Sequence, residues 1–132
     1  MDSRELKERT KKFTIQVIKF VDGLKQSTAT FVLSKQIVRS ATSIGANYRA
    51  TCGARSNAEF ITKLQIVREE SDETLYWLEL IVESGLVKAN LLDDLIKENL
   101  ELFKIVVSSI TTMKKKLNST SKDSESNKVN GK

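Results

Sequence analysis

The sequence predicts an all-α fold, an antiparallel up-down-up-down four-helix bundle that is followed by a polar tail. The 132 residues contain no proline and only five glycines, although turns and sheet edges usually recruit both. Apolar residues recur every three or four positions along four segments of about 20 to 30 residues, which is the spacing of one helix face. Hydrophobic residues make up 39% of the chain, so residues 1–117 can form one domain with an aliphatic core.

The first two helices are predicted over residues 3–24 and 30–54. Asp2 or Ser3 is the candidate N-cap of the first helix. Its apolar face is marked by Leu6, Phe13, Val17, Phe20 and Leu24. The second helix has an unbroken face of residues spaced three or four apart, formed by Leu33, Ile37, Ala41, Ile44, Tyr48 and Cys52. The small-residue stretch SATSIGANYRAT therefore continues a helix and is not a ligand-binding loop.

Gly45 lies in the middle of the second predicted helix, where glycine costs about 1 kcal/mol relative to alanine. Close approach of a neighbouring backbone would explain why glycine stands there. We therefore expect Ala41, Gly45, Ala46 and Tyr48 to mark close helix packing or an oligomer interface. Tyr48 beside Arg49 also suggests a stacking platform for a base, but a tyrosine on such a face is more often part of the core.

The third and fourth helices are predicted over residues 57–84 and 90–117. Ser56 and Glu59 have the spacing of a capping box at the start of the third helix. The apolar positions of the fourth helix are Leu92, Leu95, Phe103, Val106, Ile110, Met113 and Leu117. Residues 118–132 lack aromatic and nearly all aliphatic side chains, so they are predicted to be a disordered polar tail.

The formal net charge is +5, and it is unevenly distributed. Residues 25–58 hold five basic side chains and no acidic one, whereas residues 59–84 hold seven acidic and two basic side chains. If these helices pair about a turn near residues 54–57, Arg39 lies level with Asp72 and Glu73, and we expect a structural ion pair with one of them. The remaining cations would attract phosphate groups or form a solvated basic face, and they include Lys11, Lys12, Lys35, Arg49 and Arg55.

Several kinds of chemistry lack their usual residues. The chain has no histidine, one cysteine and no glycine-rich phosphate loop. Glu70/Glu73 and Glu98/Glu101 are two Glu-x-x-Glu pairs, and a bundle could in principle hold metal ions between such carboxylates. The usual metal site of a helix bundle needs histidine as well. We expect no enzyme activity, metal, cofactor or small-molecule substrate. The charged N-terminus, the lack of a long apolar run and the lone cysteine favour a cytoplasmic protein without membrane contact.

Two blocks of the sequence resemble the four-helix-bundle family related to the 23S rRNA intervening-sequence protein. The first block matches at Gln36, Arg39, Ser40, Ser43, Ile44 and Asn47, and the second at Ser56, Glu59, Phe60, Glu70, Glu73, Trp77 and Leu78. The resemblance covers roughly residues 5–115. Many relatives have Ala-Glu-Gly in place of Tyr48-Arg49-Ala50, and many have Gly-Ser in place of Glu70-Ser71.

The resemblance implies a left-handed bundle that assembles into a ring, typically a homopentamer, and a related accessory protein of diversity-generating retroelements is a basic ring that engages nucleic acid. Two hypotheses follow. The first is a non-catalytic ring that binds structured RNA or a ribonucleoprotein through Lys11, Lys12, Lys35, Arg49 and Arg55. The second is a protein–protein scaffold or accessory subunit with no nucleic-acid role.

Overall fold

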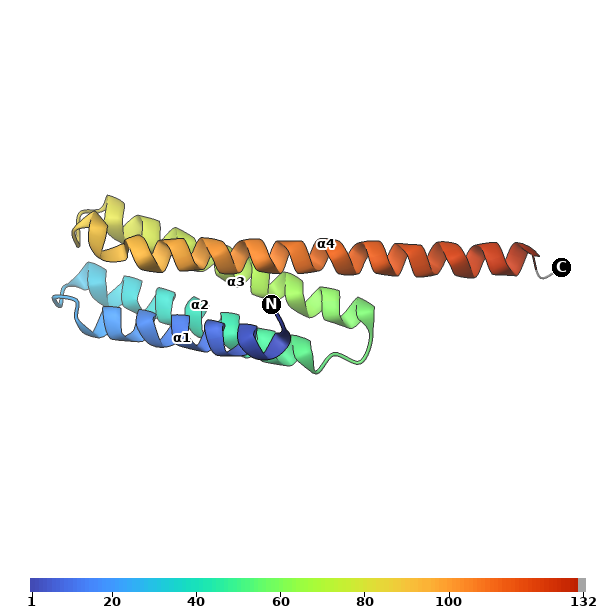
Figure 1. Cartoon of the computed structure of the whole chain (residues 1–132). Helices are drawn as coiled ribbons and strands as arrows, with labels where there is room; N and C mark the ends of the chain where they lie inside the picture. Colours follow the sequence, from blue (N-terminus) through green and yellow to red (C-terminus); the bar gives the residue numbers. More distant parts are fainter. Residues whose placement is uncertain (131–132) are drawn as a thin grey trace.

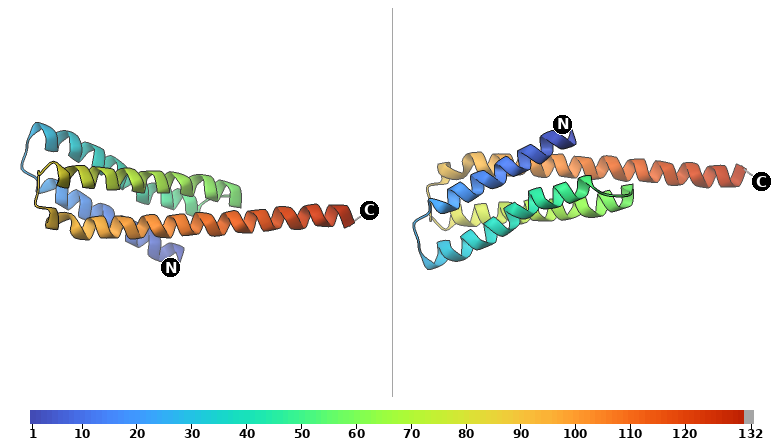
Figure 2. Two further views of the ribbon diagram at one scale, coloured as in Figure 1. Left: turned by 90° about the horizontal axis from the view of Figure 1, so that it is seen from above. Right: turned by 90° about the horizontal axis from the view of Figure 1, so that it is seen from below.

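Four long helices lie side by side in an elongated bundle (Figures 1 and 2). The computed structural model describes the backbone of residues 1–130 and the side chains of residues 1–119. The elements are α1 (Ser3–Asp22), α2 (Thr28–Cys52), α3 (Asn57–Glu83), the 3-10 turn η1 (Ala89–Leu92) and α4 (Asp93–Asn130). The all-α prediction is confirmed. Each helix packs on its neighbours in the cyclic order α1, α2, α3, α4, and within this part of the chain the Cα atoms of the diagonal helices lie more than 8 Å apart.

Side-chain caps fix three of the helix starts. The Asp2 carboxylate accepts a hydrogen bond from the Glu5 amide, and the Ser56 hydroxyl accepts one from the Glu59 amide. At the start of α2, Ser27 and Thr30 form a reciprocal capping box, which places the first residue of this helix two positions before the predicted Thr30. These caps satisfy amide groups that have no partner within the helix.

The link between α3 and α4 differs from the sequence prediction. Gly85 follows α3 with a φ of 74°, in the left-handed region that favours glycine. The fourth helix was expected from residue 90, but residues Ala89–Leu92 form a 3-10 turn and the α-helix begins at Asp93. Lys88, which precedes the turn, makes no side-chain capping bond, so no cap directs an α-helix to start there.

The core is aliphatic and runs the length of the bundle. Its fully buried side chains include Phe13, Ile37, Ile44, Leu64 and Leu78. Leu92 of η1 is buried, and on α4 the buried positions are Leu95, Asn99, Leu102, Val106 and Ile110. Phe103, which the sequence pattern places in this row, is only half-buried. The polar residue Asn99 thus interrupts the apolar row of α4. For this reason the sequence pattern gave no core position between Leu95 and Phe103.

A polar layer interrupts the core about halfway along the bundle. The Thr74 hydroxyl of α3 lies 2.8 Å from the Ser40 hydroxyl of α2 and donates to it, and both side chains are fully buried. On the other side of α3, the Asn99 Nδ2 of α4 donates to the Ser71 carbonyl oxygen at 3.2 Å. These contacts fix the heights of α2, α3 and α4 relative to one another.

Two features expected from the sequence are not tested by the described residues. The disordered tail at residues 118–132 lies almost wholly outside the residues whose side chains the structure describes, and it stays a prediction. The left-handed sense of the bundle also stays a prediction. Among the described residues, no helix is long and apolar enough to cross a membrane.

Candidate nucleic-acid interface

A groove between α1 and α2 brings together several of the predicted cations. Lys7 and Lys11 line it from α1, and Arg49 lines it from α2. Gly45 and Ala46 lie between them, and the hollow has a volume of about 500 Å³. Its other lining residues are Glu8, Thr14, Ile15 and Thr42. Three cations and one carboxylate thus surround a small-residue surface that an anion can approach.

α1 packs on α2 beside this groove. The Thr14 hydroxyl donates to the Ala41 carbonyl oxygen at 2.9 Å, and Thr10 lies against Gly45. Residue numbers rise along α1 as they fall along α2, so these two helices are antiparallel. A methyl group at Gly45 would lie 3.5 Å from the Thr10 Oγ1, which is an ordinary van der Waals distance. Close approach of α1 therefore does not require glycine at this position.

The other residues of the small-residue stretch divide between core and surface. Ala41 and Tyr48 are buried, whereas Ala46 is exposed. Burial, together with a hydrogen bond to Cys52, raises the pKa of the Tyr48 hydroxyl. Tyr48 is therefore a core residue and offers no open face for stacking. Of the two roles expected for Ala46, only an oligomer interface is compatible with its exposure.

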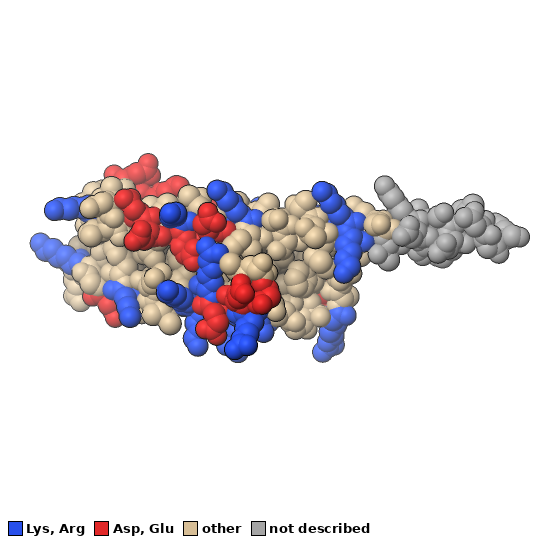
Figure 3. Space-filling model, in the orientation of Figure 1, with Lys and Arg blue, Asp and Glu red and all other residues tan. Residues whose placement is uncertain are grey.

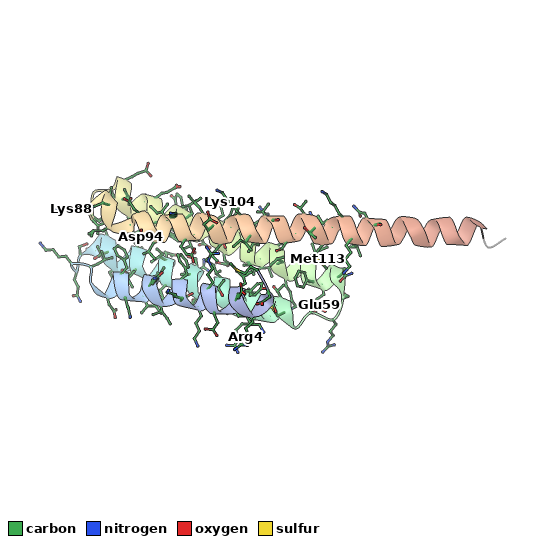
Figure 4. The ribbon with its side chains drawn as sticks, in the orientation of Figure 1. Arg4, Glu59, Lys88, Asp94, Lys104 and Met113 are labelled. Carbon is green, nitrogen blue, oxygen red and sulfur yellow. The ribbon has the colours of Figure 1, made fainter. Side chains whose placement is uncertain are left out.

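Arg55 lies in the link between α2 and α3, close to the same end of the bundle. Its amide donates to the Glu59 Oε2 at 3.0 Å, which holds the link against the first turn of α3. The Arg55 side chain is exposed. The same end receives the α4 lysines: because Asn99 is level with Ser71, Lys114 and Lys115 lie level with the start of α3. Figure 4 shows Glu59 and Met113 at this end of the bundle, Lys88 and Asp94 toward the other end, and Arg4 between them.

We refer to this region as the basic end. It comprises Arg4, Lys7, Lys11, Lys12, Arg49, Arg55, Lys114 and Lys115. The acidic residues at the same heights include Asp2, Glu5, Glu8, Glu59, Glu69 and Glu101. On the face drawn in Figure 3, the side of the bundle near the start of α3 shows basic side chains with almost no acidic ones, whereas the rest of that face is mixed. Positive charge is thus concentrated toward one end.

Not all the predicted phosphate-binding residues belong to one cluster. Lys11 and Arg49 share the groove, and Arg55 is nearby in the link. Lys12 lies on another side of α1, in a hollow with Arg4 and Arg9. Lys35 lies in the other half of α2, where its Nζ is 4.2 Å from the centroid of the Phe31 ring. The structure therefore separates Lys35 from the other four.

Arg39 of α2 is the basic side chain that faces the carboxylates of α3. It forms ion pairs with Glu73 and, at 3.4 Å, with Glu70. The contact with Arg39 lowers the pKa of Glu73, whereas burial raises the pKa of Glu70 in spite of the same arginine. The closer pair is the stronger one, so Glu73 is the main partner. Asp72 is exposed, about 100° around α3 from Glu73, and the second carboxylate at Arg39 is that of Glu70 instead.

Two features of the structure were missed by the sequence reasoning. Arg9 of α1 makes a two-pronged contact with Glu98 of α4, through Nε at 2.8 Å and Nη2 at 2.6 Å. This contact raises the pKa of Arg9. The second feature is the buried Asn99. The first and last helices of a bundle become neighbours only when it closes, so no local spacing pointed to the contact of Arg9 with Glu98. Asn99 gave no signal of burial because it is a polar residue within an apolar row.

Comparison with known proteins agrees with the earlier resemblance. A family model described as 23S rRNA-intervening sequence protein matches residues 3–108. A crystal structure of a protein of unknown function from the S23 ribosomal protein family of Bacteroides thetaiotaomicron is similar, with 35% sequence identity and a TM-score of 0.77. The match covers 84% of this chain and 99% of that one. No curated protein matches the chain.

Proposed function

Because the chain belongs to the family of 23S rRNA-intervening sequence proteins, we propose that it is a non-catalytic, homo-oligomeric bundle that binds structured RNA through its basic end. The observation that carries this proposal is the convergence of cations from three helices and one link on that end. Phosphate groups are the dominant contact of most RNA-binding surfaces, and lysine and arginine neutralise them. The oligomer is a pentamer if the resemblance extends to assembly.

The form of the basic end favours backbone contact over base recognition. Its cations lie along helix faces and in one link, and the aromatic residue that the sequence offered for stacking, Tyr48, is buried. Sequence-specific recognition of RNA usually needs splayed bases that stack on aromatic side chains. We therefore expect the protein to recognise the shape and charge of a folded RNA without strong sequence preference.

Oligomerisation would strengthen this binding. Each chain carries a formal net charge of +5, so a ring of several chains presents several basic ends to one polyanion. Linked sites raise the effective concentration for each further contact, and weak individual contacts then give a tight complex.

The test is the affinity for a fluorescent RNA hairpin, measured by anisotropy over a range of salt concentrations. The double variant Arg49→Ala plus Arg55→Ala should bind more weakly at low salt, and its affinity should depend less steeply on salt. The matched control is Lys88→Ala plus Lys97→Ala, which removes the same charge from exposed positions outside the basic end and should leave both properties almost unchanged.

An unchanged affinity of the Arg49/Arg55 variant would show that the basic end does not carry the contact. If the wild-type protein ignores RNA at low salt, the alternative of a protein–protein scaffold with no nucleic-acid role takes precedence.

A further inference from the structure

Two surfaces in the half of the bundle away from the basic end have charged side chains that form no ion pair among residues 1–119. The first is a groove between α1 and α2, which we call the Phe31 groove. It has a volume of about 750 Å³ and is lined by Val21, Leu24, Phe31, Ser34 and Lys35, among others. Phe31 is 62% exposed and is the central apolar side chain of this hollow.

The Phe31 groove has a basic side. The Lys35 ammonium lies over the Phe31 ring, and within the described part of the chain no carboxylate pairs with it. Lys25 is exposed in the link that borders the groove, and Asp22 lines its α1 edge. Ile18 is exposed one turn before Asp22 on α1 and extends the apolar surface. An exposed phenylalanine that shares a groove with an unpaired cation is a surface suited to an acidic, aromatic partner.

The second surface is a row on α3, which we call the acidic stripe. It consists of Asp72, Tyr76, Glu79 and Glu83, which lie four, three and four positions apart and so share one helix face. All four side chains are exposed, and Tyr76 is 54% exposed with its ring 5.0 Å from that of Trp77. In the part of the chain whose side chains are described, none of the three carboxylates takes part in an ion pair.

The two surfaces face away from each other within one chain. Ser71, Thr74 and Leu78 direct α3 toward the core, and Glu70 and Glu73 face Arg39 on α2, so the acidic stripe occupies the remaining side of α3. The Cα atoms of α1 and α3 lie more than 8 Å apart within the described residues. The stripe therefore cannot reach the Phe31 groove of its own chain.

The two surfaces nevertheless lie at the same height along the bundle. The contact of Thr74 with Ser40 sets the register of α2 against α3, and it places Lys35 level with residues near Glu79. A rotation about an axis that runs along the helices preserves height. Such a rotation can bring the acidic stripe of one copy onto the Phe31 groove of the next, with Glu79 beside Lys35 and one exposed aromatic ring on each side.

We propose that the partner of the Phe31 groove is the acidic stripe of a second copy of this chain. The contact joins two different surfaces, so a pair of copies still has one free groove and one free stripe. Further copies can occupy these, and a closed ring leaves no groove or stripe free. This inference rests on the proposed function for the existence of an oligomer, and it adds which surfaces build that oligomer. It also places every basic end on the same rim of the ring, clear of the contact.

The chemistry of the stripe favours this occupant over RNA. Three carboxylates on one helix face repel phosphate groups, while they complement Lys35 and Lys25. The aromatic rings of Phe31 and Tyr76 supply the apolar centre that stable protein interfaces need, with charged residues around it.

The experiment measures the mass of the full chain in solution by size exclusion with light scattering, at about 0.15 M salt. The wild-type protein should have a discrete mass that is a multiple of the 14.9 kDa chain. Lys35→Glu and Glu79→Lys each place like charges opposite each other and should shift the mass to that of a single chain. The double variant, Lys35→Glu plus Glu79→Lys, restores opposite charges and should recover the wild-type mass. Lys88→Glu, an exposed residue outside both surfaces, is the matched control and should keep the oligomer.

A wild-type protein with the mass of one chain would overturn the inference, as would single variants that stay oligomeric. Single variants that dissociate without recovery in the double variant would contradict the pairing of Lys35 with Glu79. Thermal melts of each variant by circular dichroism show that the dissociated chains are folded. RNA binding is measured on the same samples. A wild-type monomer that binds RNA would overturn this inference and the homo-oligomeric part of the proposed function, and it would leave the RNA-binding part standing. An intact oligomer that ignores RNA would overturn the RNA-binding part of the proposed function alone.

Discussion

Asn99 of α4 donates from its Nδ2 to the carbonyl oxygen of Ser71 in α3, at 3.2 Å, and its own Oδ1 is buried with no hydrogen-bond partner among the described residues. The side chain is 1% exposed and lies between Leu95 and Leu102 in the apolar row of α4. An unpaired buried oxygen costs about 1 to 3 kcal/mol. A single buried amide in a helix seam can also fix which residues pair across the helices. Asn99 thus lowers the stability of the bundle while it restricts the position of α4 on α3.

Replacing Asn99 with leucine should stabilise the bundle. The change removes the unpaired oxygen and adds apolar contact, so we expect the free energy of unfolding to rise by about 1 kcal/mol, measured by urea denaturation. Asn99→Asp has nearly the same shape and is the matched control. It should lower the free energy of unfolding, because it buries a charge. A leucine variant that is less stable than the wild type would show that the hydrogen bond to Ser71 outweighs the unpaired oxygen.

Gly45→Ala should also stabilise the bundle. The new methyl group would meet Thr10 at 3.5 and 3.7 Å, and the helix interior gains up to about 1 kcal/mol from the better helix former. Thermal unfolding should therefore show a higher melting temperature. Gly45→Leu is the contrasting variant, since its larger side chain must displace Thr10 or Lys11. If alanine lowers the melting temperature of the isolated chain, the packing of α1 on α2 is tighter than these distances indicate.

The sequence reasoning succeeded where a contact depends on residues close in the chain. Four helices follow from apolar spacing, and the turn between α2 and α3 is short enough to set Arg39 level with Glu73. The pairing of residues about this turn gives their heights along the bundle but not their angles around the helix. It therefore could not show that the second carboxylate at Arg39 is that of Glu70 and not that of Asp72. Angle follows from which face of α3 is buried. Ser71 and Thr74 lie on that face, but the predicted ion pair rested on a comparison of heights alone.

The candidate interface was harder to predict for a related reason. Charge counts show that residues 25–58 are basic, but they do not show that Lys35 and Arg49 lie in different halves of the bundle. Their separation of 14 positions along α2 corresponds to about 21 Å. Lys114 and Lys115 approach Arg55 only because α4 returns along α3, which is a tertiary relationship. Asn99 was passed over because a polar residue in an apolar row gives no signal of burial.

The triad of Arg39, Glu70 and Glu73 predicts a pH dependence. Contact with Arg39 lowers the pKa of Glu73 below its usual value of 4.5, so the stability that this pair contributes is present above that value and is lost as the pH falls through the lowered pKa. Glu70 acts in the opposite direction, because burial raises its pKa and protonation then favours the folded state. Arg39→Gln should raise the pKa of both carboxyl groups. Carboxyl-carbon NMR during an acid titration measures this, and an unchanged Glu73 pKa would contradict the pairing.

The α4 lysines provide a last test of the basic end, independent of the α1–α2 groove. If Lys114 and Lys115 contact RNA phosphates, each contact contributes about 0.7 to 0.9 to the slope of log affinity against log salt. Lys114→Gln plus Lys115→Gln should therefore lower that slope by about 1.5, and it should weaken binding similarly for hairpins of different sequence, because phosphates carry no base information. Lys88→Gln plus Lys97→Gln removes equal charge elsewhere and should leave the slope unchanged. A loss confined to one hairpin sequence would instead indicate base recognition, and the shape-and-charge account of the basic end would then be wrong.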